Sequence, residues 1–357
     1  MILIISQSYI DAPTDYVYDW LKCLGVPCRR LNGVDLIKNL GFGIRLGGGA
    51  EDMQMHSGKI NLQDISAVWI RRWITHYEFT KVRFESEEEA LLGDVIERSN
   101  SSPLEGDKAS SVLKVLADDI NEHIDGEFRG LSHYFFEFIK DKPTLGNRFY
   151  AGKDPSKAHQ LLVAAKVGLS VPATLITDSK VELQAFKTQY KGIICKNIAD
   201  IGFFHFISSA ATYTHLLTDS DIEALPESFF PTLFQQSVDK EFEIRAFVLG
   251  EEIYSMAIFS SKDERTEVDF RRYNHQNPNR NIPFKLPAET EIQIKNFMKL
   301  TGLQTGSIDL IYSKTGEFVF LEVNPVGQFS MVSTPCNYRL EKKVAEHLIN
   351  LSQNGRN

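Results

Sequence analysis

The sequence predicts a mixed α/β chain in which a parallel α/β region comes first and α+β regions follow. Two observations support this expectation. Residues 2–5 are a short apolar run, and a helical stripe and a second strand follow it as a β-α-β unit, which is typical of an open parallel sheet. From Phe234 onward, strands joined by tight turns dominate. The 357 residues are too many for one ordinary core, so we expect two or three domains.

The N-terminal region contains further strands and helices. Thr14 is a good N-cap for the first helix, and Arg71 and Arg72 lie near the carboxyl end of the last strand, where α/β sheets bind ligands. The glycine-rich residues 41–49 predict a surface hairpin, because they fit no dinucleotide fingerprint. Strands are expected at residues 2–5, 27–31 and 67–73, and helices after Thr14 and at residues 84–97 and 112–124.

The pattern changes between residues 125 and 143, where we place the first domain boundary. Ser156 then caps a helix that ends at Gly168. Strands are expected at residues 169–175, 192–196, 243–249 and 253–259, helices at 181–189, 289–300 and 340–351, and a hairpin at 307–323. The resulting domains are residues 1–140, 141–234 and 235–357.

Composition excludes several classes of protein. Lys and Arg number 39 and Asp and Glu 47, and the net charge of −8 argues against a nucleic-acid partner. No apolar run approaches the roughly 20 residues that span a membrane, and no secretory signal is present, so we expect a cytoplasmic protein. The four cysteines form no CxxC pair, which indicates small buried residues in a reducing compartment. A phosphate-loop-like stretch at residues 146–154 has the wrong glycine spacing and lacks the terminal hydroxyl.

The last hairpin carries the strongest chemical signal. Asp309 and Glu322 interrupt apolar strands, and buried carboxylates are costly unless they are paired or bind a metal. A four-residue turn would place Asp309 opposite Glu322, and Asn324 lies on the same strand face as Glu322. Two carboxylates and an amide oxygen suit Mg²⁺, which usually bridges to substrate phosphates. The alternative is an edge strand whose acids face water.

Several cations precede this hairpin. Lys196 ends an apolar strand and Lys157 begins a helix, so either ammonium group could contact a phosphate. Arg245, Arg271 and Arg272 could stabilise charge on a transferring phosphoryl group, with Asn274 close by. Lysines at strand ends and lone surface arginines are also common without any function.

Taken together, these motifs resemble the ATP-grasp fold over residues 145–340, and the ending FLEVNPVGQ is the most specific part. Within that superfamily the chain is similar to ribosomal-protein glutamate ligases and, more closely, to peptide-macrocyclising ATP-grasp ligases of the microviridin and grasp-with-spasm type. The N-terminal stretches MILIISQS, AVWIRRW and NRFYAGKDPSKAHQL resemble that subgroup in particular. The resemblance implies an N-terminal parallel-sheet domain followed by two subdomains that clamp ATP.

The resemblance also assigns roles to residues. It implies that Lys157 and Lys196 bind the nucleotide phosphates, and that Gln235, Gln236 and Val238 form the adenine-binding hinge. It implies catalytic roles for Arg245, Arg271 and Asn274, and Mg²⁺ ligation, of two ions, by Asp309, Glu322 and Asn324. The loop after Lys196 departs from the family pattern, because it offers only Gly202 where many members are glycine-rich.

Three functions are compatible with the motifs. The first is ATP-dependent formation of ω-ester or ω-amide crosslinks in a ribosomal precursor peptide that has a leader and a core. The second is addition of a free amino acid such as glutamate to a peptide or small acceptor, and the third is an ATP-binding module without turnover. A homodimer is compatible with the resemblance, because related ligases often pair through the N-terminal domain, but no feature of the sequence demonstrates it.

Overall fold

The computed structural model describes twelve stretches of the chain: residues 1–6, 11–32, 43–45, 52–55, 58–72, 82–83, 106–146, 156–198, 203–205, 209–211, 214–259 and 279–354. The chain divides into two compact units. The first comprises Met1–Leu31, Ile65–Trp73 and Pro143–Asn357, and the second Asn32–Asp64 and Ile74–Lys142. The helix predicted at residues 84–97 lies outside the described residues.

The first unit begins with a four-stranded sheet. Its apolar strands are β1 (Ile2–Ser6), β2 (Cys28–Asn32), β6 (Ala67–Ile70) and β7 (Thr144–Leu145), in the order β2-β1-β6-β7. β1 pairs parallel with β6, and β6 with β7, so the predicted parallel sheet is confirmed.

The helix α1 (Ala12–Cys23) follows β1 and begins earlier than the sequence predicts. Asp11 is its N-cap residue, whereas the predicted cap, Thr14, lies within the first turn and is buried. The Thr14 hydroxyl donates to Asp11 Oδ2 at 2.6 Å. A proline at the start of the helix explains the shift, because its fixed φ suits the first helical turn.

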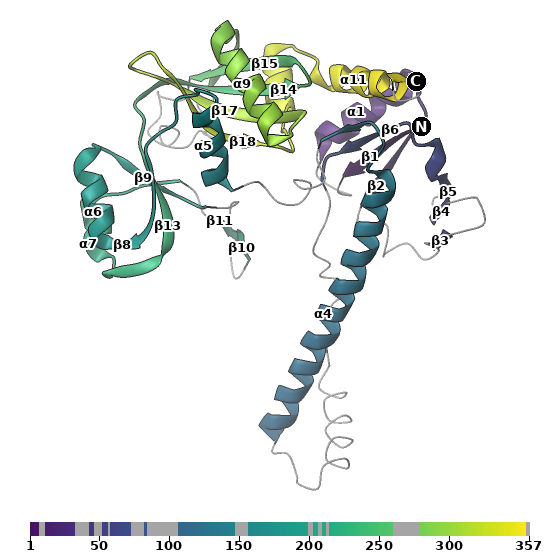
Figure 1. Ribbon diagram of the computed structural model, residues 1–357, viewed down its shortest axis with the longest axis horizontal. Helices are drawn as coiled ribbons and strands as arrows, with labels where there is room; N and C mark the ends of the chain where they lie inside the picture. Colours follow the sequence, from purple (N-terminus) through teal and green to yellow (C-terminus); the bar gives the residue numbers. More distant parts are fainter. Residues whose placement is uncertain are drawn as a thin grey trace. The chain divides into compact units, whose positions relative to one another are not determined.

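The core of this sheet extends into the C-terminal part of the chain. Ile4 and Leu21 pack in one cluster with Phe247 and Met256, and with Leu348 of the last helix, α11 (Leu340–Asn354). The first and last elements of the chain therefore share one hydrophobic core, and Figure 1 shows α11 beside α1.

A second sheet is antiparallel and has the order β12-β9-β13-β8. Its strands are β8 (Thr174–Ser179), β9 (Ile193–Lys196), β12 (His215–Leu216) and β13 (Ser228–Gln236). One face packs on α6 (Lys180–Gln189) and α7 (Asp219–Ala224) through a small core that includes Leu183, Ile222 and Phe234. A short antiparallel hairpin, β10 (Phe203–His205) and β11 (Ser209–Ala211), comes between β9 and β12 in the sequence.

The third sheet is the largest and has the order β16-β15-β14-β17-β18. Its strands are β14 (Lys240–Leu249), β15 (Glu252–Phe259), β16 (Arg280–Phe284), β17 (Thr305–Ser313) and β18 (Phe318–Asn324). The predicted helices α5 (Lys157–Lys166) and α9 (Ala288–Thr301) pack on one face, as Figure 1 shows. A short helix, α10 (Ser330–Cys336), precedes α11 and was not predicted.

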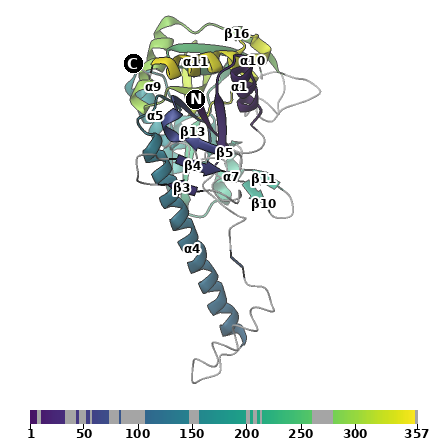
Figure 2. The same ribbon diagram turned by 90° about the vertical axis from the view of Figure 1, so that its right-hand side faces the viewer.

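The second unit contains a three-stranded antiparallel sheet and a long helix. The strands are β3 (Gly43–Arg45), β4 (Asp52–Met55) and β5 (Gly58–Asn61), followed by a 3-10 turn, η1 (Leu62–Asp64). β3 pairs antiparallel with β4, so a hairpin forms in this region as predicted, but its paired residues, 43–45 and 52–54, extend beyond the expected residues 41–49. The helix α4 (Gly106–Ile139) has 34 residues and is longer than the helix predicted at residues 112–124. Figure 2 shows it along its whole length. It continues through most of the segment where the first domain boundary is expected.

Two sequence expectations can be compared with these elements. None of the described helices is both long and apolar enough to span a membrane. The four cysteines are free thiols; Cys28 and Cys336 are buried, Cys195 is half-buried, and Cys23 is exposed. Burial raises the pKa of the Cys28, Cys195 and Cys336 thiols, which keeps them protonated and unreactive at neutral pH.

Candidate active site

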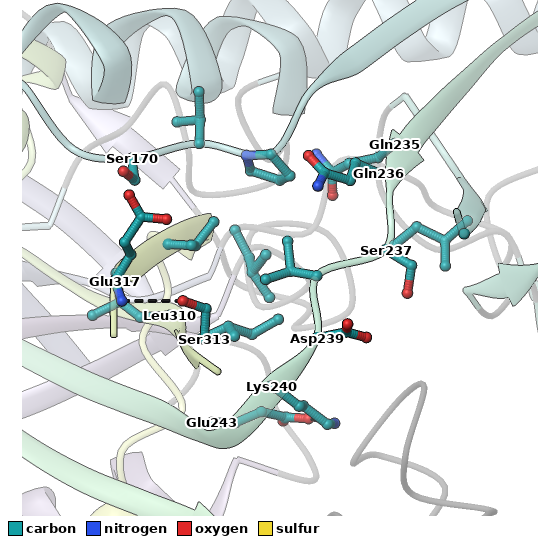
Figure 3. A pocket seen from close by; sticks show the side chains of 18 of the residues that line it. Ser170, Gln235, Gln236, Ser237, Asp239, Lys240, Glu243, Leu310, Ser313 and Glu317 are labelled. Atoms are coloured by element: carbon teal, nitrogen blue, oxygen red, sulfur yellow. Dashed lines mark hydrogen bonds and ion pairs between the residues drawn. The ribbon is translucent and has the colours of Figure 1, made fainter. Parts of the chain in front are cut away.

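A pocket of about 1070 Å³ lies between the second and third sheets. Figure 3 shows its wall, with Gln235 and Gln236 on one side and Glu243 and Ser313 on the other. Most of the residues that the sequence singled out gather around this pocket. They are Lys157, Lys196, Gln235, Gln236, Val238, Asp309 and Glu322.

The two carboxylates lie opposite each other, as predicted. Asp309 on β17 pairs with Glu322 on β18, although the hairpin is less regular than its length suggests. A regular four-residue loop would pair Ser313 with Phe318, but here Tyr312 pairs with Phe318. A bulge at Leu321 shifts the pairing by one residue and so brings Asp309 opposite Glu322. The bulge therefore turns Glu322 onto the same face as Asp309.

Each carboxylate has a cationic partner. Lys157 Nζ lies 3.2 Å from Glu322 Oε2, and Arg245 Nη1 lies 3.3 Å from both oxygens of Asp309. Arg245 and Asp309 are also direct partners across β14 and β17. The Arg245 Nε atom is buried without a hydrogen-bond partner, which is unusual for a guanidinium group. One N–H of Arg245 is therefore uncommitted next to the carboxylates.

The helix α5 brings Lys157 to this position because it is fixed to β18. Gln160, on the same helix, is buried, and its Oε1 accepts from the backbone N–H of Val323 at 2.7 Å. The backbone N–H of Lys157 itself donates to Ile198 O at 3.3 Å. The ammonium group thus reaches Glu322 from a helix that is hydrogen-bonded to the adjacent residue of the same strand.

Asn324, the third predicted metal ligand, follows on the same face of β18, opposite Ser307. Its Oδ1 accepts from the backbone N–H groups of Val326 and Gly327 at 3.0 and 3.2 Å. Gly327 has φ +63, which favours glycine, so the chain turns sharply after the strand. The amide group of Asn324 is therefore held by its own loop, and its role as a ligand stays a prediction.

The donor set fits a hard divalent cation. Asp309 and Glu322 offer carboxylate oxygens from adjacent strands, and both side chains are partly buried at a pocket that also contains cations. Among the described residues no three His, Cys, Asp or Glu side chains form a metal-sized group. An ion here would consequently need further oxygens from water or from a phosphate, as Mg²⁺ commonly does.

The strand β13 carries the predicted hinge. The Gln236 N–H donates to Ala173 O at 2.8 Å and the Ser237 N–H to Gly192 O at 2.9 Å, while Val238 lines the pocket beyond them. The Gln235 side chain is buried and accepts from Lys196 Nζ at 2.9 Å. Gln235 thus contacts the predicted phosphate lysine with its side chain, which the sequence did not indicate.

Two features of the pocket were not predicted. Lys240 and Glu243 form a buried ion pair on its wall, close to the end of β13. The charged residues in the first half of β14, before its apolar end, were a sequence signal for this ion pair. The contribution of Thr174, whose hydroxyl accepts from Gln235 Nε2 at 3.0 Å, had no sequence signal.

Arg71 does not contact the pocket, contrary to the expectation that ligands bind at the end of β6. It is 2% exposed, and its Nη1 donates to Gly327 O at 2.7 Å and to Val326 O, while its Nη2 lies 3.2 Å from Asp11 Oδ1. Burial lowers the pKa of Arg71 to about 10, and the Asp11 carboxylate opposes that shift, so the side chain stays charged at neutral pH. Arg71 therefore fixes the loop after β18 to the parallel sheet.

This combination of a cation-lined pocket between two antiparallel sheets and a paired carboxylate hairpin agrees with the comparison to known families. The model of the RimK-like ATP-grasp domain matches residues 152–348, more than half of the chain. The chain belongs to this ATP-grasp family. The predicted fold class is confirmed, and the chain is an ATP-dependent ligase of that family.

Solved structures extend the likeness to nearly the whole chain. An ATP-grasp ligase associated with RiPPs (ribosomally synthesised and post-translationally modified peptides) from Chryseobacterium gregarium, in complex with ADP and a leader and core peptide, has a TM-score of 0.77 and 23% identity, covering 98% of this chain and 96% of that one. The macrocyclase MdnC from Microcystis aeruginosa MRC, bound with precursor peptide MdnA, has a TM-score of 0.70 and 22% identity, covering 98% and 99%. The ATP-grasp ligase PsnB, complexed with minimal precursor, Mg and ADP, has a TM-score of 0.68 and 17% identity, covering 98% and 97%. Among curated proteins, no sequence matches the chain significantly.

Two of the residues expected in the ATP-grasp site have no position here. Arg271 and Asn274 lie outside the described residues, in the stretch between β15 and β16. The predicted division into residues 1–140, 141–234 and 235–357 likewise stays a prediction for this ATP-grasp ligase.

Proposed function

We propose that the chain joins a side-chain carboxylate to a side-chain hydroxyl or amine within one ribosomally made precursor peptide, forming an ω-ester or ω-amide crosslink. The observation that carries this proposal is the extent of the structural likeness. The RimK-like domain covers residues 152–348, whereas the C. gregarium ligase and MdnC share the fold over 98% of the chain. Both were solved with peptides of this kind, so a fold shared outside the ATP-grasp domain supports a peptide substrate.

The pocket supports a nucleotide as the second substrate. We assign the phosphates of ATP to Lys157 and Lys196, since two ammonium groups line one pocket on separate elements. The adenine ring belongs at the end of β13, beside Gln236 and Val238, where backbone groups can read its edge.

The carboxylates support a role for Mg²⁺, as in the PsnB complex with Mg and ADP. Asp309 and Glu322 would hold the ion, and Asn324 would assist from the same face. When bound, Mg²⁺ neutralises phosphate charge and orients the γ-phosphoryl group for in-line attack. Arg245 adds a fixed positive charge beside Asp309, and we assign Arg271 and Asn274 to the same task from the family resemblance.

The reaction has two steps, and the protein acts in both by positioning groups and compensating charge. A carboxylate oxygen of the peptide attacks the γ-phosphorus, the bond to the ADP oxygen breaks, and an acyl-phosphate and ADP result. A hydroxyl or amine of the same peptide then attacks the acyl carbon, loses its proton, and displaces inorganic phosphate. The peptide therefore loses one water for each crosslink.

Mass spectrometry tests this proposal. The full chain is incubated with ATP, Mg²⁺ and candidate precursor peptides encoded next to its gene, and loss of one water per crosslink is the expected result. Fragmentation then places the missing water on an acidic residue and a Ser, Thr or Lys residue. An unchanged peptide mass with every cognate candidate would overturn the proposal.

The RimK-like match favours one competing function, the addition of a free amino acid such as glutamate. The same spectrum separates the two functions, because the acceptor would gain the mass of an amino-acid residue instead of losing water. A non-catalytic ATP-binding module would release no ADP in the presence of peptide.

A further inference from the structure

One face of the second sheet carries polar side chains, and two of them, Lys196 and Gln235, line the pocket. On its other face Ile193 and Phe234 pack against Leu183 of α6 and Ile222 of α7, so the side chains that alternate with Ile193 and Phe234 along β9 and β13 face the pocket. Cross-strand pairing aligns Thr174 with Gln235, Gln235 with Ile194, and Leu233 with Lys196. Thr174, Gln235 and Lys196 therefore lie on the same face of three neighbouring strands.

These three side chains form a hydrogen-bond chain with a fixed direction. The Thr174 hydroxyl donates its hydrogen to Pro172 O at 2.9 Å, so it can only accept from its other neighbour, Gln235 Nε2, at 3.0 Å. The amide orientation of Gln235 follows, because its Nε2 must point to Thr174. Its Oε1 consequently points to Lys196 Nζ, at 2.9 Å.

The contact of Lys196 with Gln235 differs in charge from the contacts that two other cations near the pocket make. Lys157 and Arg245 lie against the carboxylates of Glu322 and Asp309, which offset their charge. Gln235 offers a neutral carbonyl oxygen, so this contact orients the Lys196 ammonium group without offsetting its positive charge. Gln235 is also 2% exposed, so the amide is held by its surroundings and does not exchange freely with water.

We propose that Gln235, oriented by Thr174, is a positioning residue that aims the Lys196 ammonium group at a nucleotide phosphate. This inference rests on the proposed function, and it replaces a simple hinge role for Gln235 with a role for its side chain. Because Gln235 acts through Lys196, its removal should weaken binding of phosphate-bearing nucleotides and leave binding of the nucleoside unchanged.

The test compares ADP with adenosine as titrants of the full chain by calorimetry. In the Gln235→Leu variant we expect about tenfold weaker ADP binding, since a hydrogen bond to a charged group is lost, and adenosine affinity within about twofold of wild type. The Gln235→Glu variant should weaken ADP as well, because a carboxylate would compete with the phosphate for Lys196. Equal losses for ADP and adenosine, or no loss for either, would overturn the proposal.

Two threonines provide a matched control for the other end of the chain. Thr174 and Thr232 each donate to the carbonyl two residues earlier, but only the Thr174 hydroxyl is seen to accept from Gln235. Thr174→Val should weaken ADP by about threefold, which is less than loss of Gln235 because the amide remains, and Thr174→Ser should restore wild-type binding. Thr232→Val should bind ADP as wild type does.

The outcomes separate this inference from the proposed function. If the wild-type chain binds neither ADP nor adenosine, the proposed nucleotide site fails. If wild type binds ADP but Thr174→Val and Thr232→Val behave alike, the directed chain from Thr174 is wrong. Thermal unfolding of each variant, followed by circular dichroism, confirms that the compared proteins are folded at the titration temperature.

Discussion

Two buried arginines of this chain, Arg71 and Arg245, lie beside carboxylates but have different roles. Arg71 is 2% and Arg245 6% exposed. Arg71 bonds two backbone carbonyls, Asp11 and the Thr14 hydroxyl, and its guanidinium group stacks 5.3 Å from the ring centre of Phe329. Among the residues that the structure describes, Arg245 Nη1 donates to the two oxygens of Asp309 at 3.3 Å, and the buried Nε has no hydrogen-bond partner.

The difference teaches how to separate a structural arginine from a functional one. A structural guanidinium group has its donors satisfied by the fold, since each unpaired buried N–H costs free energy. A buried guanidinium group with an uncommitted N–H retains capacity for a ligand, and Arg245 lies where two carboxylates meet at the pocket. Three predictions follow from this contrast, and they concern activity first and stability afterwards.

The largest effect is expected for Arg245→Met. Removal of a fixed donor that stabilises charge in the transition state lowers kcat by about 10²–10³-fold. ADP release in the presence of the cognate peptide measures this effect. The control is Arg30→Met, since Arg30 forms an ion pair with Asp15, whose side chain is 57% exposed. Arg30→Met should keep turnover within about twofold of wild type, and an equal loss in both variants would contradict the contrast.

The next effect concerns the free energy of unfolding, for which Arg71 and not Arg245 is expected to matter more. Arg71→Met leaves the Asp11 carboxylate buried without its cation, and it should lower the free energy of unfolding by about 3–5 kcal/mol. Urea unfolding measures this loss, and Arg30→Met should cost at most about 1 kcal/mol.

A double variant sharpens this stability prediction. Combining Arg71→Met with Asp11→Leu removes both charges, so the double variant should be more stable than the sum of the single losses predicts. Strict additivity would show that the two charges do not interact, and the interpretation of Arg71 as a structural arginine would then rest on its carbonyl contacts alone.

The sequence predicts local features of this molecule well and long-range contacts poorly. The opposition of Asp309 and Glu322 follows from the length of one hairpin, yet the bulge at Leu321 that maintains it does not, because bulges depend on packing. The contact of Arg71 with Gly327 spans 256 residues, and no pattern in either segment indicates it.

The Gln235 side chain makes the same point within the site. Its place at the end of β13 is predictable from the family motif, whereas its contact with Lys196 depends on strand pairing across 39 residues. Residue type and spacing therefore predict which groups belong to the site, and the sheet register decides which of them touch.

The smallest predicted effect lies at the far side of the second sheet, away from the pocket. Thr218 and Asp221 form a capping box at the start of α7. Hydrogen bonds from the Thr218 backbone N–H and hydroxyl, and then from His215, lower the pKa of Asp221 to about 2. A carboxyl group whose pKa is lower in the folded state stabilises above its unfolded pKa and loses that contribution as the pH falls from about 4 to about 2.

Thr218→Ala should therefore raise the pKa of Asp221 toward its ordinary value and cost about 1 kcal/mol of stability at neutral pH. Carboxyl-carbon NMR titration measures the pKa, and urea unfolding at about pH 7 and about pH 2.5 measures the stability. The difference between wild type and variant should shrink at the lower pH, because about pH 2.5 lies close to the Asp221 pKa of wild type and below the ordinary pKa that the unfolded chain has. Asp219→Asn, at an exposed carboxyl group in the same turn, should leave the Asp221 titration unchanged; a shift equal to that of Thr218→Ala would show that general charge, and not the capping box, sets this pKa.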